Sequence, residues 1–335
     1  MMLGNVIASF ALAFVFAMSL AQADPPEFLP VPDLAPTPTF APATQPSTPS
    51  TRKDDDDDDD EKRPTAPSGR YFFNLLDSRS AYGKDFFPDP FLGPEFDVEK
   101  QLELDYFHAE RRHVQDNAVD AGFQWNVLGQ LMVAGEFGWD SEREIGVHGL
   151  DDSCEESARG FENVDLAVYH PVFQYVSKSG FLDYTAVARL DVGIPTRTAV
   201  SGSDLQLTPY LGQLLRLGPH VSLEAWTGAQ FTVAPHQSGH DLFIYGASLG
   251  YQLAHDQLPV PFTEQLFPTL EIDGQSPFSD RSTPESLFAV AGVAINFVPL
   301  GNLHPRLNLG YQFPLDRGAR DELDWGIIAN LFIEF

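Results

Sequence analysis

The sequence has a single cysteine and few basic residues. Cys154 cannot form a disulfide within the chain, and one cysteine cannot build a cysteine-based metal cluster. Lysine and arginine number 20 against 48 aspartate and glutamate residues, which gives a formal net charge of -28. This balance disfavours a nucleic-acid partner, because binding to phosphates requires clusters of basic side chains. It instead suits a surface or an interior that attracts cations.

Long hydrophobic runs are also lacking. Beyond the N-terminus, the sequence contains no apolar stretch of the roughly 18 residues that a transmembrane helix needs. If the chain spans a membrane, it must do so as a closed β-barrel, because only helices and closed barrels satisfy all backbone hydrogen bonds in lipid.

Residues 1–23 are typical of a secretory signal peptide. Val6 to Leu20 is apolar, and Ala21-Gln22-Ala23 forms a small-residue cleavage site before acidic Asp24. The usual lysine or arginine before the apolar run is missing, and a membrane-anchoring helix is the alternative.

The next two segments predict no ordinary globular domain. Residues 24–69 are rich in proline, threonine, serine and alanine, which predicts a disordered linker. Within it, Asp54–Asp60 is a run of seven aspartates that predicts a solvated spacer, with a loose tether for cations or a basic partner as the alternative. Residues 70–95 combine aromatic residues with proline. They predict a segment that packs on the periplasmic mouth or enters the lumen as a plug, or else a short periplasmic interaction motif.

From Phe96 onward, segments of about ten residues alternate apolar and polar side chains, with turns or polar loops between them. Bacterial single-chain barrels have an even number of strands, and about twelve are predicted here. We therefore expect an all-β fold, a transmembrane antiparallel up-and-down β-barrel over residues 96–335. The weakest predictions are Glu162–His170 and Leu266–Asp273, without which ten strands would remain. The predicted strands are Asp97–Phe107, Asn117–Leu128, Leu131–Trp139, Glu162–His170, Phe181–Val192, Asp204–Leu217, Val221–Val233, Asp241–Leu253, Leu266–Asp273, Leu287–Phe297, Arg306–Leu315 and Leu323–Phe335.

One face of each predicted strand is apolar, and the opposite face carries charged side chains. A soluble β-sandwich would not hold such charges unpaired in its core. Acidic residues predominate on this face, so a water-filled lumen would favour cations. An internal network of ion pairs that plugs a narrow barrel is the alternative, because eight strands leave room only for side chains and sixteen leave a channel. The expected lumen-facing charged residues are Glu103, Asp105, Asp183, Arg189, Asp191 and Arg306.

Several glycines lie inside predicted strands, at Gly246, Gly250, Gly292 and Gly310. We interpret them as places where the barrel bends or where its wall thins.

One short motif is a candidate for catalysis. His236-Gln237-Ser238 resembles the His-x-Ser motif of outer-membrane phospholipase A barrels, in which an asparagine orients the histidine. Gly250 stands where that family keeps its asparagine, so a hydrolase remains a minor alternative. His236, His240 and Asp241 set no coordination geometry for a metal. We expect no enzyme, no cofactor and no resident metal.

The last strand reads W-G-I-I-A-N-L-F-I-E-F and ends on an aromatic residue. This ending resembles the C-terminal strand of bacterial outer-membrane β-barrels. The resemblance implies an outer-membrane location and recognition by the barrel-assembly machinery. On this strand, Trp325, Ile327, Leu331, Ile333 and Phe335 are the expected assembly signal, and the same face is expected to meet outer-membrane lipid.

Residues 307–317, L-N-L-G-Y-Q-F-P-L-D-R, together with the last strand are similar to transporter-like and porin-like outer-membrane barrels, including those grouped with aromatic-degradation operons. The resemblance covers Phe96 to Phe335 and implies passive passage of an unidentified small solute. The alternative is a plugged barrel that serves as a structural or adhesive anchor, with its N-terminal segment in the periplasm.

Overall fold

The computed structural model describes residues 68–71, 89–96, 98–111, 114–128, 130–144, 157–177, 179, 181–196, 198, 204–233, 241–254, 257, 260–278 and 285–335. Residues 1–67, which include the expected signal peptide, the linker and Asp54–Asp60, lie outside this part of the chain, as do residues 72–88.

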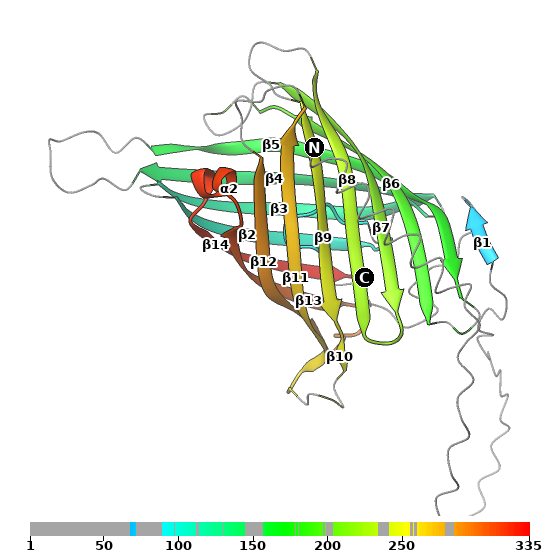
Figure 1. Cartoon of the computed structure of the whole chain (residues 1–335). Helices are drawn as coiled ribbons and strands as arrows, with labels where there is room; N and C mark the ends of the chain where they lie inside the picture. Colours follow the sequence, from blue (N-terminus) through cyan, green and yellow to red (C-terminus); the bar gives the residue numbers. More distant parts are fainter. Residues whose placement is uncertain are drawn as a thin grey trace, which may run out of the picture. The chain divides into compact units, whose positions relative to one another are not determined.

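Twelve antiparallel strands form a closed barrel (Figure 1). Closure is complete because β14 pairs with β2 and β5 pairs with β6, while every other barrel strand pairs with its neighbours in the sheet. The barrel strands are β2 (Gln101–Arg111), β3 (Val114–Leu128), β4 (Leu131–Glu144), β5 (Ser157–Val176), β6 (Leu182–Ile194), β7 (Leu205–Leu217), β8 (Val221–Val233), β9 (Leu242–Tyr251), β11 (Thr263–Pro277), β12 (Ser286–Phe297), β13 (His304–Pro314) and β14 (Trp325–Glu334).

Two short strands lie beside the barrel wall. β1 (Ser68–Tyr71) pairs with the end of β5, and β10 (Leu253–Ala254) pairs with β11. Among the described residues, no helix is long and apolar enough to cross a membrane. The helix α2 (Arg317–Glu322) lies between β13 and β14, and its N-cap Asp316 accepts a hydrogen bond of 2.8 Å from the backbone N–H of Ala319.

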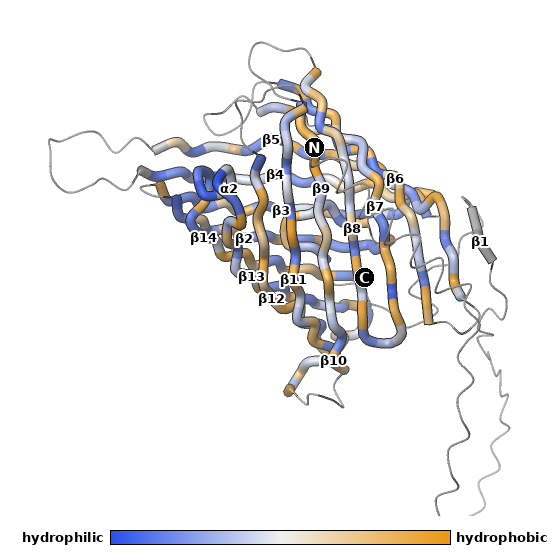
Figure 2. The backbone as a smooth tube through the Cα atoms, in the orientation of Figure 1, coloured by the Kyte–Doolittle hydropathy of each residue, from blue (hydrophilic) through white to orange (hydrophobic). Residues whose placement is uncertain are grey.

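The outer face of the barrel is apolar, as the alternation in the sequence predicts. Leu102, Leu104 and Tyr106 are exposed on β2, whereas Gln101, Glu103 and Asp105 between them are less exposed. Polar and apolar residues accordingly alternate along the strands in Figure 2. An apolar exterior around a polar interior is the inverse of a soluble protein and is characteristic of a barrel in lipid. The chain is therefore an outer-membrane type of β-barrel.

All twelve predicted strands are present, but several of their limits differ. The prediction for the first strand was wrong at its start, because β2 begins at Gln101 rather than at Asp97. Phe96 and Val98 do not continue the wall: Phe96 is buried in a core cluster, and Val98 packs against that cluster. The two weakest predictions correspond to long strands, β5 with 20 residues and β11 with 15.

Candidate functional site

Residues 89–96, 98 and 99, called here the inner segment, contact inward-facing side chains of the barrel wall. The first contact is with the side chain of Glu271 on β11, and this side chain is fully buried. Its carboxylate accepts backbone hydrogen bonds from Phe91 at 2.6 Å, from Leu92 at 2.8 Å and from Gly93 at 3.2 Å. Hydrogen bonds to a charged acceptor are roughly twice as strong as neutral ones, so this carboxylate fixes the turn at residues 91–93.

The second contact involves Arg306 on β13. Its Nη2 lies 2.9 Å from the Asp89 carboxylate and 2.9 Å from the Glu99 carboxylate, and all three side chains are buried. The same nitrogen donates to the Gln101 side-chain oxygen at 2.7 Å. Both ends of the inner segment are thus tied to one guanidinium on the barrel wall.

Aromatic side chains complete this packing, and glycines in the wall make room for them. A Cβ atom added at Gly292 or at Gly310 would collide with the Phe91 ring, and one at Gly212 would collide with the Phe96 ring. These glycines are where the wall thins, as interpreted for Gly292 and Gly310 from the sequence.

The Trp226 ring is held in a similar way between two glycines. A Cβ added at Gly93 of the inner segment, or at Gly246 of β9, would overlap this ring. Trp226 is fully buried, and its indole Nε1 donates to Asp273 at 3.3 Å. The inner segment therefore packs on the indole, which itself lies against the wall.

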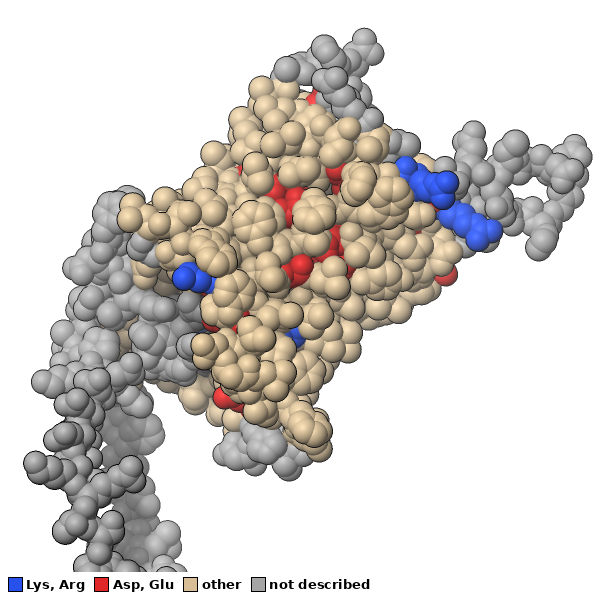
Figure 3. Space-filling view, turned by 180° about the vertical axis from the view of Figure 1, so that it is seen from behind, with Lys and Arg blue, Asp and Glu red and all other residues tan. Residues whose placement is uncertain are grey.

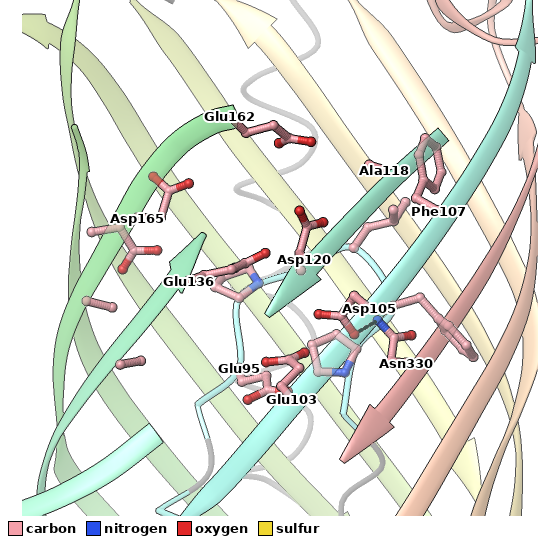
Figure 4. A pocket seen from close by; sticks show the side chains of 18 of the residues that line it. Glu95, Glu103, Asp105, Phe107, Ala118, Asp120, Glu136, Glu162, Asp165 and Asn330 are labelled. Carbon is pink, nitrogen blue, oxygen red and sulfur yellow. Dashed lines mark hydrogen bonds between the residues drawn. The ribbon is translucent and has the colours of Figure 1, made fainter. Parts of the chain in front are cut away.

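A cavity of about 480 Å³ lies in the lumen, with the inner segment forming part of its lining. Figure 4 shows carboxylates of several strands directed into this space, together with Glu95 of the inner segment. Among the described residues that line it, Arg189 is the only basic one. The carboxylates that line the cavity are those of Glu95, Glu103, Asp105, Asp116, Asp120, Glu136, Asp140, Glu162, Asp165 and Asp191.

Hydrogen bonds position a few of these charges. Asp105 accepts a hydrogen bond of 2.6 Å from the Asn330 side chain of β14, drawn as a dashed line in Figure 4. Arg189 lies 2.7 Å from Asp191 and donates to the backbone carbonyl of Glu95 at 2.5 Å. The guanidinium thus neutralises one neighbouring carboxylate and leaves a large excess of negative charge around the cavity.

The charged residues expected in the lumen fall into two groups. Glu103, Asp105, Arg189 and Asp191 line the cavity. Asp183 does not, because it forms a buried ion pair of 2.9 Å with Arg216 of β7, and Arg306 binds the inner segment as described above. The barrel therefore holds both a cavity lined by carboxylates and buried ion pairs between inward-facing side chains.

The residues expected to form the assembly signal lie on one face of β14. Ile327, Leu331 and Phe335 are exposed, and Trp325 and Ile333 are partly exposed on the same face. Gly326, Ile328 and Asn330 alternate with them and are buried. Trp325 stacks on Tyr311 of β13 with a centroid separation of 6.4 Å.

Sequence reasoning did not assign the carboxylates Asp116, Glu136, Asp140 and Glu162, and it left the position of residues 70–95 open. The signal for the inner segment was present as F-F-P-D-P-F-L-G-P, because such an aromatic stretch tends to be buried. Nothing local identified its partners.

His236, Ser238 and His240 lie outside the described residues, and Asp241 accepts a hydrogen bond of 3.1 Å from the backbone N–H of Thr232.

The space-filling view in Figure 3 shows the face of the molecule opposite to that in Figure 1. Most of its described surface is uncharged, and Asp and Glu atoms are visible near its middle. The acidic character of the lumen is therefore not matched by a charged outer surface on this face.

No family model matches the sequence, and no curated protein matches it either. Among solved structures, an outer-membrane channel from Pseudomonas putida F1 is 12% identical with a TM-score of 0.48, over 74% of this chain and 100% of that one. The NanC porin is 9% identical with a TM-score of 0.41, over 70% and 98%. The β domain of the Bordetella autotransporter BrkA is 11% identical with a TM-score of 0.38, over 71% and 100%. At these identities the likeness concerns the fold alone.

Proposed function

We propose that this outer-membrane barrel is a channel through which small solutes pass passively, with a preference for cations. The observation that carries the proposal is the cavity inside the closed barrel, whose described lining residues include ten carboxylates and one guanidinium. Fixed charge of one sign in a water-filled path concentrates ions of the opposite sign and excludes ions of the same sign. The main alternative is a barrel that only anchors its loops or its N-terminal segment in the membrane.

Conductance in planar bilayers separates these two functions. A variant without residues 24–95 lacks most of the inner segment, so a channel should give step currents in this form. A complete absence of step currents would leave the anchoring role as the better explanation.

The preference for cations is tested by the reversal potential in a potassium chloride gradient. We expect the wild-type protein to favour potassium over chloride by about tenfold, which corresponds to about 1.4 kcal/mol. A few carboxylates close to the ion path are enough for this free-energy difference, since the attraction between one carboxylate and a nearby cation is on the order of 1 kcal/mol in water. The triple variant Glu103→Gln, Glu136→Gln, Asp165→Asn should lose most of this preference.

The matched control for the triple variant is Glu264→Gln. Glu264 is exposed near the start of β11 and does not line the cavity, so its neutralisation should leave the reversal potential unchanged. Equal selectivity in the triple variant and in the wild-type protein would count against a role for the lumen carboxylates.

A second proposal concerns assembly, with the C-terminal strand as the element recognised by the barrel-assembly machinery. Phe335 is 42% exposed, contacts the Trp125 ring at 5.5 Å between centroids, and bonds through its backbone to Lys100. Phe335→Ser should reduce the amount of folded barrel in outer-membrane fractions severalfold, measured by the mobility shift between boiled and unboiled samples. Phe231→Ser is the control, because Phe231 is 43% exposed on β8. Equal amounts of folded protein in both variants would mean that Phe335 has no special role.

A further inference from the structure

The carboxylates around the cavity follow a row across the barrel wall. In the strand register, Glu103 is opposite Gly122, Gly122 is opposite Glu136, and Glu136 is opposite Asp165. Neighbouring strands are about 4.8 Å apart, so the backbone positions of Glu103 and Glu136 lie about 10 Å apart, with Asp165 one strand further. The negative charges are therefore spread along a line.

Glycines on the neighbouring strands leave room for carboxylates around the cavity. A Cβ added at Gly122 would lie 3.1 Å from the Glu103 carboxylate, and one at Gly193 would lie 3.0 Å from the Asp165 carboxylate. At Gly138 an added Cβ would overlap the Asp120 carboxylate. The carboxylates thus lie over glycine backbone against the wall, and this leaves the centre of the cavity for a ligand.

Glu95 of the inner segment provides a separate observation that points to a ligand. Only 8% of this residue is exposed, and its Oε2 accepts a hydrogen bond of 2.7 Å from Gln101. Its other carboxylate oxygen, Oε1, is buried and has no hydrogen-bond partner among the described residues. Figure 4 places Glu95 beside Glu103 in the cavity. A buried carboxylate oxygen without a donor is costly, and a bound cationic N–H group would remove that cost.

The arrangement favours an organic cation over a metal ion. Among the described residues, no group of three His, Cys, Asp or Glu side chains could hold a metal ion. The lining also includes the apolar residues Phe91, Leu92, Phe107 and Ile328, which contribute nothing to an inorganic ion but can pack against methylene groups. The cavity volume of about 480 Å³ is within the range of sites for small organic ligands.

We propose that the cavity is a binding site for linear aliphatic diamines or polyamines, which are the solutes that this channel conducts. The inference rests on the proposed passage of cations. One ammonium group would donate to Glu95 Oε1, and a second would bind a carboxylate in the row. An extended four-carbon diamine spaces its nitrogens by about 6 Å, given carbon–carbon bonds near 1.5 Å, so that its two ammonium groups can bind different carboxylates.

Block of the potassium current in planar bilayers tests this assignment. The probes are 1,4-diaminobutane, n-butylamine as the monoamine of the same chain length, and magnesium as a compact divalent cation. We expect half-block by the diamine at a concentration at least about tenfold below that of either control, a difference equivalent to about 1.4 kcal/mol. Glu95→Gln and Glu136→Gln should each raise the diamine concentration severalfold, whereas Glu264→Gln should not.

The outcomes separate the two proposals. A wild-type channel that lacks any cation preference would contradict the proposed function itself. A cation-selective channel in which butylamine or magnesium blocks as well as the diamine would overturn the diamine site alone. The inference also fails if the diamine blocks both cavity variants as it blocks the wild-type protein. Glu136→Gln serves as the second variant, because Glu95→Gln also alters the bond to Gln101.

Discussion

Glu271→Ala is expected to raise the single-channel conductance by about two- to fivefold. Without the inner segment, the interior of a twelve-stranded barrel is wider than the packed interior of eight-stranded barrels and narrower than the open channel of sixteen-stranded ones. The substitution removes the acceptor of three backbone N–H groups at residues 91–93. Each buried donor left without a partner costs about 1–3 kcal/mol, so the inner segment should leave its position. Its departure opens the part of the lumen beside β11.

Two further substitutions make this measurement specific. Glu271→Gln retains one acceptor oxygen and should raise the conductance less than alanine does. Thr269→Ala alters a neighbouring inward residue of β11 that bonds to the carbonyl of Phe267 and should leave the conductance unchanged. Deletion of residues 89–96 sets the upper limit. If that deletion and Glu271→Ala both conduct like the wild-type protein, the inner segment does not restrict the path.

Arg306→Met is expected to lower the free energy of unfolding by about 3–5 kcal/mol, the usual cost of removing one partner from a buried ion pair. The substitution leaves the buried carboxylates of Asp89 and Glu99 without this guanidinium. It also removes the contact of Arg306 with the Phe332 ring, 5.4 Å from the guanidinium carbon. Urea unfolding of the refolded barrel, followed by tryptophan fluorescence, measures the change.

Neutralising the two carboxylates in the Arg306→Met background provides the control for charge. Asp89→Asn with Glu99→Gln should restore part of the lost stability, because the buried charges are then gone and neighbouring residues are coupled. A loss below about 1 kcal/mol in Arg306→Met, which is the range of an exposed ion pair, would show that the buried pairing does not hold the segment. Failure of the two neutralising substitutions to restore stability would attribute the loss to packing.

The sequence predicted the strands of the barrel wall better than the contacts inside the barrel. The alternation on β14 places Ile327 and Leu331 outside and Asn330 inside, because successive side chains of a strand point to opposite faces. The same rule gives all twelve strands from local pattern alone. The rule is weakest where proline interrupts a strand. In β5 the register shifts after Pro171. In β11 the residues before Pro268 pair with β10, and those after it pair with β9.

By itself, then, the sequence determined that the chain forms an even-numbered barrel with an apolar exterior and a charged interior, since a period of two and the hydrophobicity of lipid act on each strand separately. Only the tertiary structure decided which interior charges are paired and which line a cavity. Arg306 meets Gln101 across 205 positions, and Phe91 reaches Glu271 across 180. No local pattern encodes such contacts, because closure of the barrel is what brings these residues together. The cavity is acidic because Arg306 and Arg216 are paired elsewhere, so that Arg189 is the only basic side chain among the described residues of its lining.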